Sequence, residues 1–213
     1  MRIAALKIDC QSPDPAILDQ AARVLLRGEA VIAPTETRYG LLARADQQEM
    51  IERLYEIKQR ELSQATAVFV RDLTELAQLG RLTVSAEKLA RRFLPGPLTL
   101  VLQAIPDWLP PRVVDGKIGL RWSSAATIQG LEERLRLPLT ATSANISGKS
   151  DAESVEELAA AFGDRVALYL DAGPLAGAVS TVVDCTADPV RILREGAISR
   201  RQIELALGKP HVG

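Results

Sequence analysis

Short apolar runs and amphipathic stripes alternate along the whole chain, and this alternation constrains the fold more than any other feature. The first apolar run covers residues 3–8 and predicts a strand. Apolar residues at positions 17, 21, 24 and 25 then follow with helical spacing. Strands that alternate with helices over 213 residues indicate one α/β domain. Because the later strands are short and closely spaced, we expect a mixed sheet flanked by helices.

The same patterns predict the other elements. We expect the first helix to begin at Ser12-Pro13. We expect the second helix to be capped by Asp46 and to run to Lys58. Two further helices are expected after Asp72 and Ser85, and one between residues 122 and 139. Capping boxes predict two late helices, at Ser154 with Glu157 and at Ser199 with Gln202. Strands are expected over residues 30–33, 39–45, 66–70, 98–102, 118–122, 139–142, 166–170, 181–185 and 190–193.

The composition excludes several classes of function. The chain has 26 Lys plus Arg against 27 Asp plus Glu, and this balance argues against bulk electrostatic binding of nucleic acid. It has no long apolar run and an early charge at its start, so we expect no membrane partner and a cytoplasmic location. The two cysteines lie far apart and predict neither a disulfide framework nor a zinc cluster.

The single histidine, His211, lies at the end of the chain and argues against catalytic triads and two-histidine metal sites. An enzyme with this composition would work through Lys, Arg, Ser, Thr and backbone groups. Those groups suit the holding of anions better than the movement of protons.

Two segments of the first half suit a binding site. Pro34-Thr35-Glu36-Thr37-Arg38-Tyr39-Gly40 follows an apolar strand, where hydroxyls can line a crevice, although a plain turn uses the same residues. Lys58-Gln59-Arg60 ends a helix, and Lys58 lies four residues after Leu54, on the flank of the buried stripe. Two cations in this place can hold a phosphate or carboxylate, or can simply complement the helix dipole.

Further candidates lie in the second half. The segment 140–148 follows a strand and offers hydroxyl, amide and backbone donors to an anion, or else forms a capping turn. Ser143, in this segment, has no histidine base, so we expect a hydrogen-bond donor rather than a nucleophile. Arg121 lies in an apolar strand and needs an anionic partner if it points inward; an outward position on the sheet is the alternative. Arg194 ends a similar strand, and Ser180-Thr181 opens another.

In this order, the segments resemble the YrdC-like family of threonylcarbamoyl-AMP synthases. The similarity covers residues from about 15 to 205, the expected core of a single domain over 1–213. The chain resembles the short form of the family, which has no extra C-terminal domain. The resemblance implies a twisted, open α/β sheet with a large concave basic cavity. The matching motifs are Pro34-Thr35-Glu36-Thr37 with Tyr39-Gly40-Leu41, Ile57-Lys58-Gln59-Arg60, residues 93–99, Gly119-Leu120-Arg121, residues 142–148, residues 180–184 and residues 192–196.

The resemblance also implies an activity. Members of the family are nucleotidyltransferases that convert L-threonine, bicarbonate and ATP, with Mg²⁺, into threonylcarbamoyl-AMP and pyrophosphate. The product feeds the modification of an adenosine in tRNA by downstream tRNA-modification proteins. Attack of a carbamate on the α-phosphate needs positioning and charge neutralisation rather than a side-chain base.

Roles follow for single residues from the same resemblance. Thr35 and Arg121 would bind the threonine, and Ser180 would lie at the same end of the cavity. Lys58 and Arg60 would be the catalytic cations. No protein ligand to the metal is implied, so Mg²⁺ would be held mainly by the phosphates. The nucleotide phosphates would be bound by Lys58, Arg60, Ser143, Asn145 and Arg194.

The sequence departs from the family pattern at three places. Glu61 directly follows Arg60, and Gln64 stands where an additional lysine is expected. Trp122-Ser123 replaces a small apolar residue and a proline, and Lys149-Ser150-Asp151 lacks the usual Ser-Pro. The missing cation corresponds to about 1–3 kcal/mol of charge-assisted hydrogen bonding.

These departures leave two alternatives to the main interpretation. The first is that the chain is a divergent paralogue that binds nucleotide or RNA in the same cavity with weak, altered or no catalysis. The second is carbamoyl transfer to an amine other than threonine. Weak contact with RNA or tRNA is compatible with the balanced charge only if cations gather locally.

Overall fold

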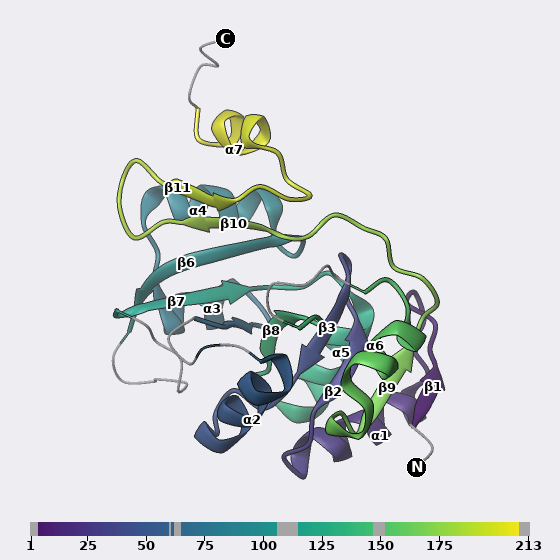
Figure 1. The fold of residues 1–213 in the computed structure, drawn as a ribbon. Coiled ribbons are helices and arrows are strands. Elements are labelled where there is room, and N and C mark those ends of the chain that lie inside the picture. The colour runs from purple at the N-terminus through teal and green to yellow at the C-terminus, as the bar shows by residue number, and fades with distance from the viewer. Residues whose placement is uncertain (1–3, 60, 62–64, 106–114, 147–151, 209–213) are drawn as a thin grey trace.

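The computed structural model describes residues 4–59, 61, 65–105, 115–146 and 152–208 (Figure 1). It contains the α-helices α1 (Pro15–Leu26), α2 (Gln48–Lys58), α3 (Leu73–Leu79), α4 (Val84–Phe93), α5 (Ala126–Leu135), α6 (Val155–Phe162) and α7 (Arg200–Ala206), and a short 3₁₀ helix, η1 (Gly163–Arg165). The strands are β1 (Ala5–Lys7), β2 (Val31–Pro34), β3 (Tyr39–Leu42), β4 (Ala67–Phe69), β5 (Gly80–Arg81), β6 (Leu98–Ala104), β7 (Lys117–Arg121), β8 (Thr140–Ser143), β9 (Leu168–Asp171), β10 (Thr181–Asp184) and β11 (Arg191–Arg194).

The strands form one mixed sheet with the order β1-β9-β2-β3-β8-β4-β7-β6-β10-β11, and β5 pairs with β6. In the first half β9 is parallel to β1 and β2, whereas β3 is antiparallel to β2 and β8. In the second half β4 is parallel to β7 and β6 is parallel to β10, whereas β6 is antiparallel to β7. The expected single α/β domain with an open, mixed sheet is confirmed.

The helices cover the sheet through two apolar cores. Helices α1 and α5 pack on each other and on β2, and this core includes Leu25, Val31 and Leu131. Helix α3 contacts β7 and α4 contacts β6, and Leu100 and Leu120 belong to the core that includes these helices. Figure 1 shows α4 behind β10. Since successive side chains of a strand point to opposite faces, the residues next to Leu100 and Leu120 face away from α3 and α4.

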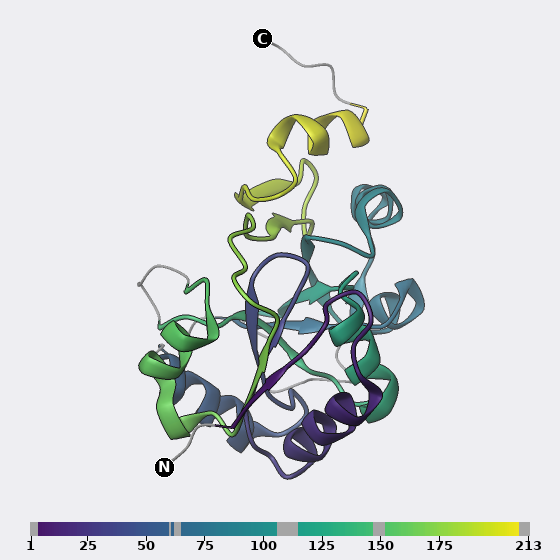
Figure 2. The same ribbon diagram turned by 90° about the vertical axis from the view of Figure 1, so that its right-hand side faces the viewer.

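The C-terminal part lies at one end of the molecule. Figures 1 and 2 show β11 and α7 at the end opposite to α1. Helix α7 begins with the predicted capping box, in which the Ser199 hydroxyl accepts from the Gln202 N–H and the Gln202 side chain accepts from the Ser199 N–H. It contacts α4 and buries Ile203.

Three predicted helix starts are wrong by one or two residues. Helix α1 is capped by Asp14, whose carboxylate accepts from the Ala16 N–H at 2.8 Å, because Asp14-Pro15 offers a second cap and proline pair directly after Ser12-Pro13. Helix α2 is preceded by Gln47 rather than Asp46, whose carboxylate instead binds Arg44 at 2.7 Å. Helix α4 is capped by Thr83 and so begins before Ser85. The two-residue strand β5 was too short to be predicted from a pattern.

Candidate functional site

A cavity of about 590 Å³ lies on the sheet face opposite to α3 and α4. Alternation within the strands defines its floor: Thr99 and Gly119 line the cavity, whereas Leu100 and Leu120 between them belong to the apolar core. The lining includes all the described residues that the sequence singled out for binding, namely Thr35, Lys58, Arg121, Ser143, Asn145, Ser180 and Arg194. Six separate segments of the chain therefore meet at one place.

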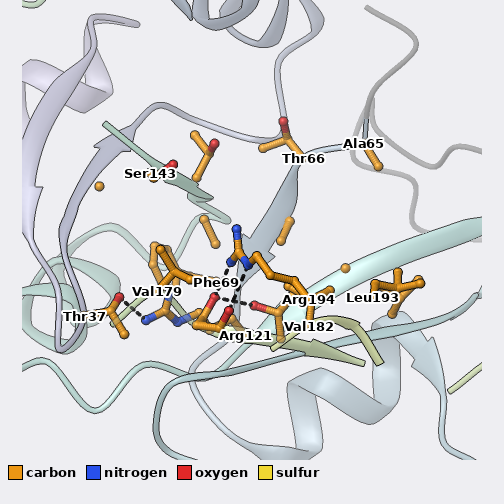
Figure 3. Close-up of a pocket in the computed structure, with 18 of the residues that line it drawn as sticks. Thr37, Ala65, Thr66, Phe69, Arg121, Ser143, Val179, Val182, Leu193 and Arg194 are labelled. Carbon is orange, nitrogen blue, oxygen red and sulfur yellow. Dashed lines mark hydrogen bonds between the residues drawn. The ribbon is translucent and has the colours of Figure 1, made fainter. Parts of the chain in front are cut away.

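The turn after β2 forms one wall of the cavity through a relay of hydroxyl groups. Thr35 Oγ1 lies 2.6 Å from the carbonyl of Arg38, which can only accept, so the Thr35 hydroxyl donates to it. The Thr37 hydroxyl, 3.0 Å away, then donates to Thr35 and accepts from Arg121 Nη2 at 2.9 Å. This order of donors fixes both threonine side chains and leaves a polar wall next to Arg121 (Figure 3).

Arg121 points inward, a position for which an arginine needs an anionic partner. The side chain is only 7% exposed, and its Nη2 lies 3.0 Å from Glu36 Oε1. Its guanidinium carbon lies 5.8 Å from the centre of the Phe69 ring. Among the described residues no group accepts a hydrogen bond from Arg121 Nε, although this atom is buried. Arg121 thus lines the cavity with one buried hydrogen-bond donor that the described residues leave unsatisfied.

Lys58 joins the end of α2 to the loop after β8. It is 2% exposed, which confirms that it leaves the helix on the buried flank. Its Nζ donates to the carbonyl of Ser143, to the carbonyl of Asn145 at 3.0 Å and to Asn145 Oδ1 at 2.9 Å. The Ser143 hydroxyl also donates to Asn145 Oδ1, at 2.8 Å. The lysine, the serine and the asparagine thus form one hydrogen-bonded cluster on the cavity wall.

Ser180 and Arg194 meet where β10 pairs with β11. The guanidinium of Arg194 donates to the Ser180 carbonyl at 3.0 Å and to the Ser180 hydroxyl at 2.9 Å. The Thr99 hydroxyl lies 3.4 Å from the Ser180 hydroxyl. Nearby, a Cβ atom on Gly196 would collide with the carbonyls of Val179 and Ser180, so the chain can pass there only as glycine. These contacts hold Arg194 over the cavity (Figure 3).

The cavity lining also contains a charged group, Asp184, which belongs to the motif 180–184 but has no role predicted from the sequence. Asp184 Oδ2 lies 3.0 Å from Lys117 Nζ and 3.9 Å from Arg191 Nη2. Burial acts to raise the pKa of Asp184, but hydrogen bonds from Thr186 and Lys117 outweigh it, and the pKa lies below its ordinary value. The signal in the sequence was the alternation of Lys117, Gly119 and Arg121, which places all three on one face of β7.

Small residues leave room above the centre of the floor. Ala67 pairs with Ala141, and Val101 pairs with Gly119. A Cβ atom added to Gly119 would lie 3.1 Å from the Ala67 Cβ. The cavity therefore depends on short side chains at the start of β4, at the middle of β7 and within β8.

The charged residues in the lining are mostly cationic. The cationic residues are Arg38, Lys58, Lys117, Arg121, Arg191 and Arg194. The anionic residues are Asp115 and Asp184. Within the described part of the chain, no three His, Cys, Asp or Glu side chains gather so that they could hold a metal ion. Two expected residues, Arg60 and Gln64, lie outside the described residues, and the Glu61 side chain is exposed.

Fold and cavity together define an α/β protein with an open mixed sheet that is hollowed on one face. The family model for Sua5, yciO and yrdC proteins, described as telomere recombination, matches residues 23–196. The chain therefore belongs to the Sua5/YciO/YrdC family. The matched residues lie within the expected core of 15–205. No helix in the described ranges is long and apolar enough to cross a membrane.

Relatives and solved structures agree with this membership. The threonylcarbamoyl-AMP synthase of Bacillus subtilis is 38% identical over 203 residues, which are 93% of this chain and 58% of that protein. A putative threonylcarbamoyl-AMP synthase of Methanocaldococcus jannaschii is 33% identical over 85% of this chain and 86% of its own length. The crystal structure of P. abyssi Sua5 complexed with L-threonine superposes with a TM-score of 0.87 at 32% identity. That alignment covers 98% of this chain and 62% of the P. abyssi chain, so this chain spans about three fifths of two of these relatives.

Proposed function

We propose that the chain forms threonylcarbamoyl-AMP and pyrophosphate from L-threonine, bicarbonate and ATP, for the threonylcarbamoyl-adenosine modification of tRNA. The convergence of six segments on one cavity carries the proposal, because each brings a residue that the family resemblance assigns to a substrate. The names of the B. subtilis and M. jannaschii relatives and the threonine complex of P. abyssi Sua5 support it.

Threonine would bind at the wall made by Thr35, Thr37 and Arg121. Arg121 lines the cavity, and its guanidinium suits the substrate carboxylate, because a guanidinium binds a carboxylate through charge-assisted hydrogen bonds. The hydroxyl relay through Thr37 holds the guanidinium from the other side. The Ser180 hydroxyl, bonded to Arg194, closes the same end of the cavity.

The nucleotide phosphates would bind between the Lys58 cluster and Arg194. Lys58, Ser143 and Asn145 supply an ammonium, a hydroxyl and an amide, and Arg194 supplies a guanidinium. Arg60 follows two residues after Lys58 and is proposed to join them. The adenosine would then occupy the end with Val101, Val182 and Leu193, where apolar side chains line the cavity.

The chemistry follows from these positions. The threonine amine and bicarbonate give a carbamate and water, and a carbamate oxygen attacks the α-phosphorus of ATP. The bond from the α-phosphorus to the oxygen that bridges to the β-phosphate breaks, and pyrophosphate leaves with the electron pair. The attacking oxygen is already anionic, so the cations contribute by neutralising charge and by aligning the two substrates.

Magnesium would arrive with ATP. Asp115 and Asp184 are the carboxylates in the described lining, and Asp184 is already bonded to Lys117 and Thr186. This donor set suits a Mg²⁺ ion that is held mainly by the phosphates, where it would offset part of their charge.

Pyrophosphate release tests the proposal. Purified protein is incubated with ATP, bicarbonate and Mg²⁺, with and without L-threonine, and the adenylate product is identified by mass spectrometry. We expect pyrophosphate and threonylcarbamoyl-AMP only when threonine is present. Release that does not depend on threonine, or none at all, contradicts the proposal, and turnover with another amine favours carbamoyl transfer to a different acceptor.

The alternative is that the chain is a paralogue that binds nucleotide or RNA without catalysis. Binding measurements and a substitution at Gln64 distinguish this alternative from the proposed enzyme. Nucleotide binding without turnover, or RNA affinity that falls steeply with salt, supports the alternative. A large gain of activity in Gln64→Lys indicates an enzyme that lacks one phosphate cation. A cytoplasmic location, a domain that spans 1–213, contact with tRNA and a role for downstream tRNA-modification proteins stay predictions.

A further inference from the structure

A carboxylate and a hydroxyl group lie behind the cavity wall, in contact with Arg121. Glu36 Oε1 lies 3.0 Å from Arg121 Nη2, and Glu36 Oε2 accepts a hydrogen bond of 2.5 Å from the Ser123 hydroxyl. We infer that Glu36 and Ser123 are positioning residues that set the orientation of the Arg121 guanidinium toward the amino-acid substrate. The inference rests on the proposed function, in which Arg121 binds the carboxylate of threonine.

The contacts of Arg121 divide its donors into two groups. Glu36 Oε1 and Thr37 Oγ1 both contact Nη2, so this nitrogen is committed to the protein. Nε is buried and has no acceptor among the described residues, so no hydrogen bond of its own fixes its direction. A planar guanidinium turns as a unit, and fixing Nη2 therefore also fixes the direction of Nε.

Glu36 acts from outside the cavity. Its neighbours Thr35, Thr37 and Arg38 line the cavity, whereas Glu36 does not belong to the lining and its side chain is 13% exposed. The carboxylate thus meets Arg121 from the back and leaves the substrate side open. Arg121 is nearly fully buried, and a buried cation needs a carboxylate partner while no substrate is bound.

Ser123 fixes the direction of the Glu36 carboxylate. The Ser123 side chain is fully buried, and its Oγ accepts from the Ala125 N–H at 3.2 Å. An N–H can only donate, so the single hydroxyl proton of Ser123 is free to go to Glu36. Gln129 Nε2 donates to the Ser123 carbonyl at 3.0 Å and holds the backbone at the start of α5.

The test combines threonine affinity with the NMR signal of the Arg121 side chain. Calorimetry gives the dissociation constant for threonine, and the Nε–Hε signal, assigned by its loss in Arg121→Lys, reports the guanidinium without any substrate. We expect Glu36→Ala to weaken threonine binding and raise its KM about tenfold with kcat nearly unchanged, because an orienting contact acts alike on substrate and transition state. The same variant broadens or shifts the Arg121 signal.

Two further variants identify how the pair works. Glu36→Gln keeps the shape of the side chain but removes the charge. Because Glu36 Oε1 makes an ion pair with Arg121 and no hydrogen bond, we expect this variant to weaken threonine binding by an amount between zero and that of Glu36→Ala. Ser123→Ala is expected to weaken threonine binding about threefold, and to add nothing in the Glu36→Ala background, since Ser123 acts through Glu36. Ser124→Ala, an exposed neighbour, is the matched control.

The results of these variants either support or overturn the orienting role of Glu36 and Ser123. An unchanged Arg121 signal in both Glu36→Ala and Ser123→Ala overturns the inference, as does full additivity of the two variants. If the wild type does not bind threonine, the proposed function fails, while the Arg121 signal still supports or overturns the orienting role. If Glu36→Ala does not fold, Ser123→Ala and Glu36→Gln supply both readouts.

Discussion

Lys58 Nζ donates a hydrogen bond of 2.9 Å to Asn145 Oδ1, and this contact ties the last residue of α2 to the loop after β8. The same ammonium donates to the carbonyls of Ser143 and Asn145. The loop residues proposed to contact phosphate are thus held in place in the structure without a nucleotide. An anion site that is already ordered loses less conformational entropy when its ligand binds.

Lys58→Met tests this arrangement, because methionine keeps most of the side-chain length and removes the charge and the three donors. We expect the KM for ATP to rise about 10–100-fold, since a charge-assisted contact and the order of the loop are lost together. The KM for threonine should change much less. Steady-state kinetics of pyrophosphate release with each substrate varied in turn measures both constants.

The exposed lysine of α4 supplies the control for Lys58→Met. Lys88→Met removes one positive charge at an exposed position that does not line the cavity, and should leave both KM values unchanged. An unchanged KM for ATP in Lys58→Met would mean that neither its charge nor its loop contacts serve nucleotide binding.

Sequence patterns could locate the polar residues of the cavity but not the way in which they meet. Lys58 was placed on the buried flank by its spacing from Leu54, and the structure confirms that position. A sequence pattern cannot place Asp184 in the cavity, because its position depends on the pairing of Asp184 with Val101 and Arg191, and strand order and register arise from long-range packing. Nor can it predict the contact of Glu36, whose partner Arg121 lies 85 residues further along the chain.

Ser180→Ala removes the hydroxyl that accepts from Arg194 Nη2 but keeps the carbonyl that accepts from Nε. Arg194 would keep one of these two contacts with Ser180, so we expect the KM for ATP to rise only about threefold, less than in Arg194→Ala. A double-mutant cycle measures the coupling. If Ser180→Ala still reduces ATP binding as strongly in the Arg194→Ala background, Ser180 does not act through this arginine.

The segment between β9 and β10 passes directly over the turn that carries Thr37. A Cβ atom on Gly177 would lie 2.5 Å from the Thr37 carbonyl, which is closer than any real contact. We expect Gly177→Ala to displace Thr37 and to raise the KM for threonine about tenfold, with a smaller effect on the KM for ATP. Ala178→Ser, at the exposed neighbouring position, is the control. Equal effects of the two variants would show that the close approach at Gly177 has no role.

Glu132 makes the free energy of unfolding fall as the pH rises, whereas a typical carboxylate in an ion pair makes it rise. This residue of α5 is 3% exposed; burial, together with repulsion from Glu75 and Glu36, raises the pKa of Glu132 to about 8. Between the ordinary pKa of a glutamate, about 4.3, and this value, the native state keeps a proton that the unfolded chain releases. The contribution of protonated Glu132 to the free energy of unfolding is therefore present at low pH and is lost as the pH rises through about 8.

Glu132→Gln removes this ionisation while keeping a neutral side chain of the same shape. We expect a melting temperature higher than that of the wild type by roughly 5 °C at pH 9 and nearly unchanged at pH 5, because only the high-pH native state contains a buried charge. Thermal unfolding at pH 5, 7 and 9 measures the difference. Glu133→Gln changes the exposed neighbour on α5 and should show no such trend. A gain of equal size at every pH would mean that packing, rather than ionisation, separates Glu132→Gln from the wild type.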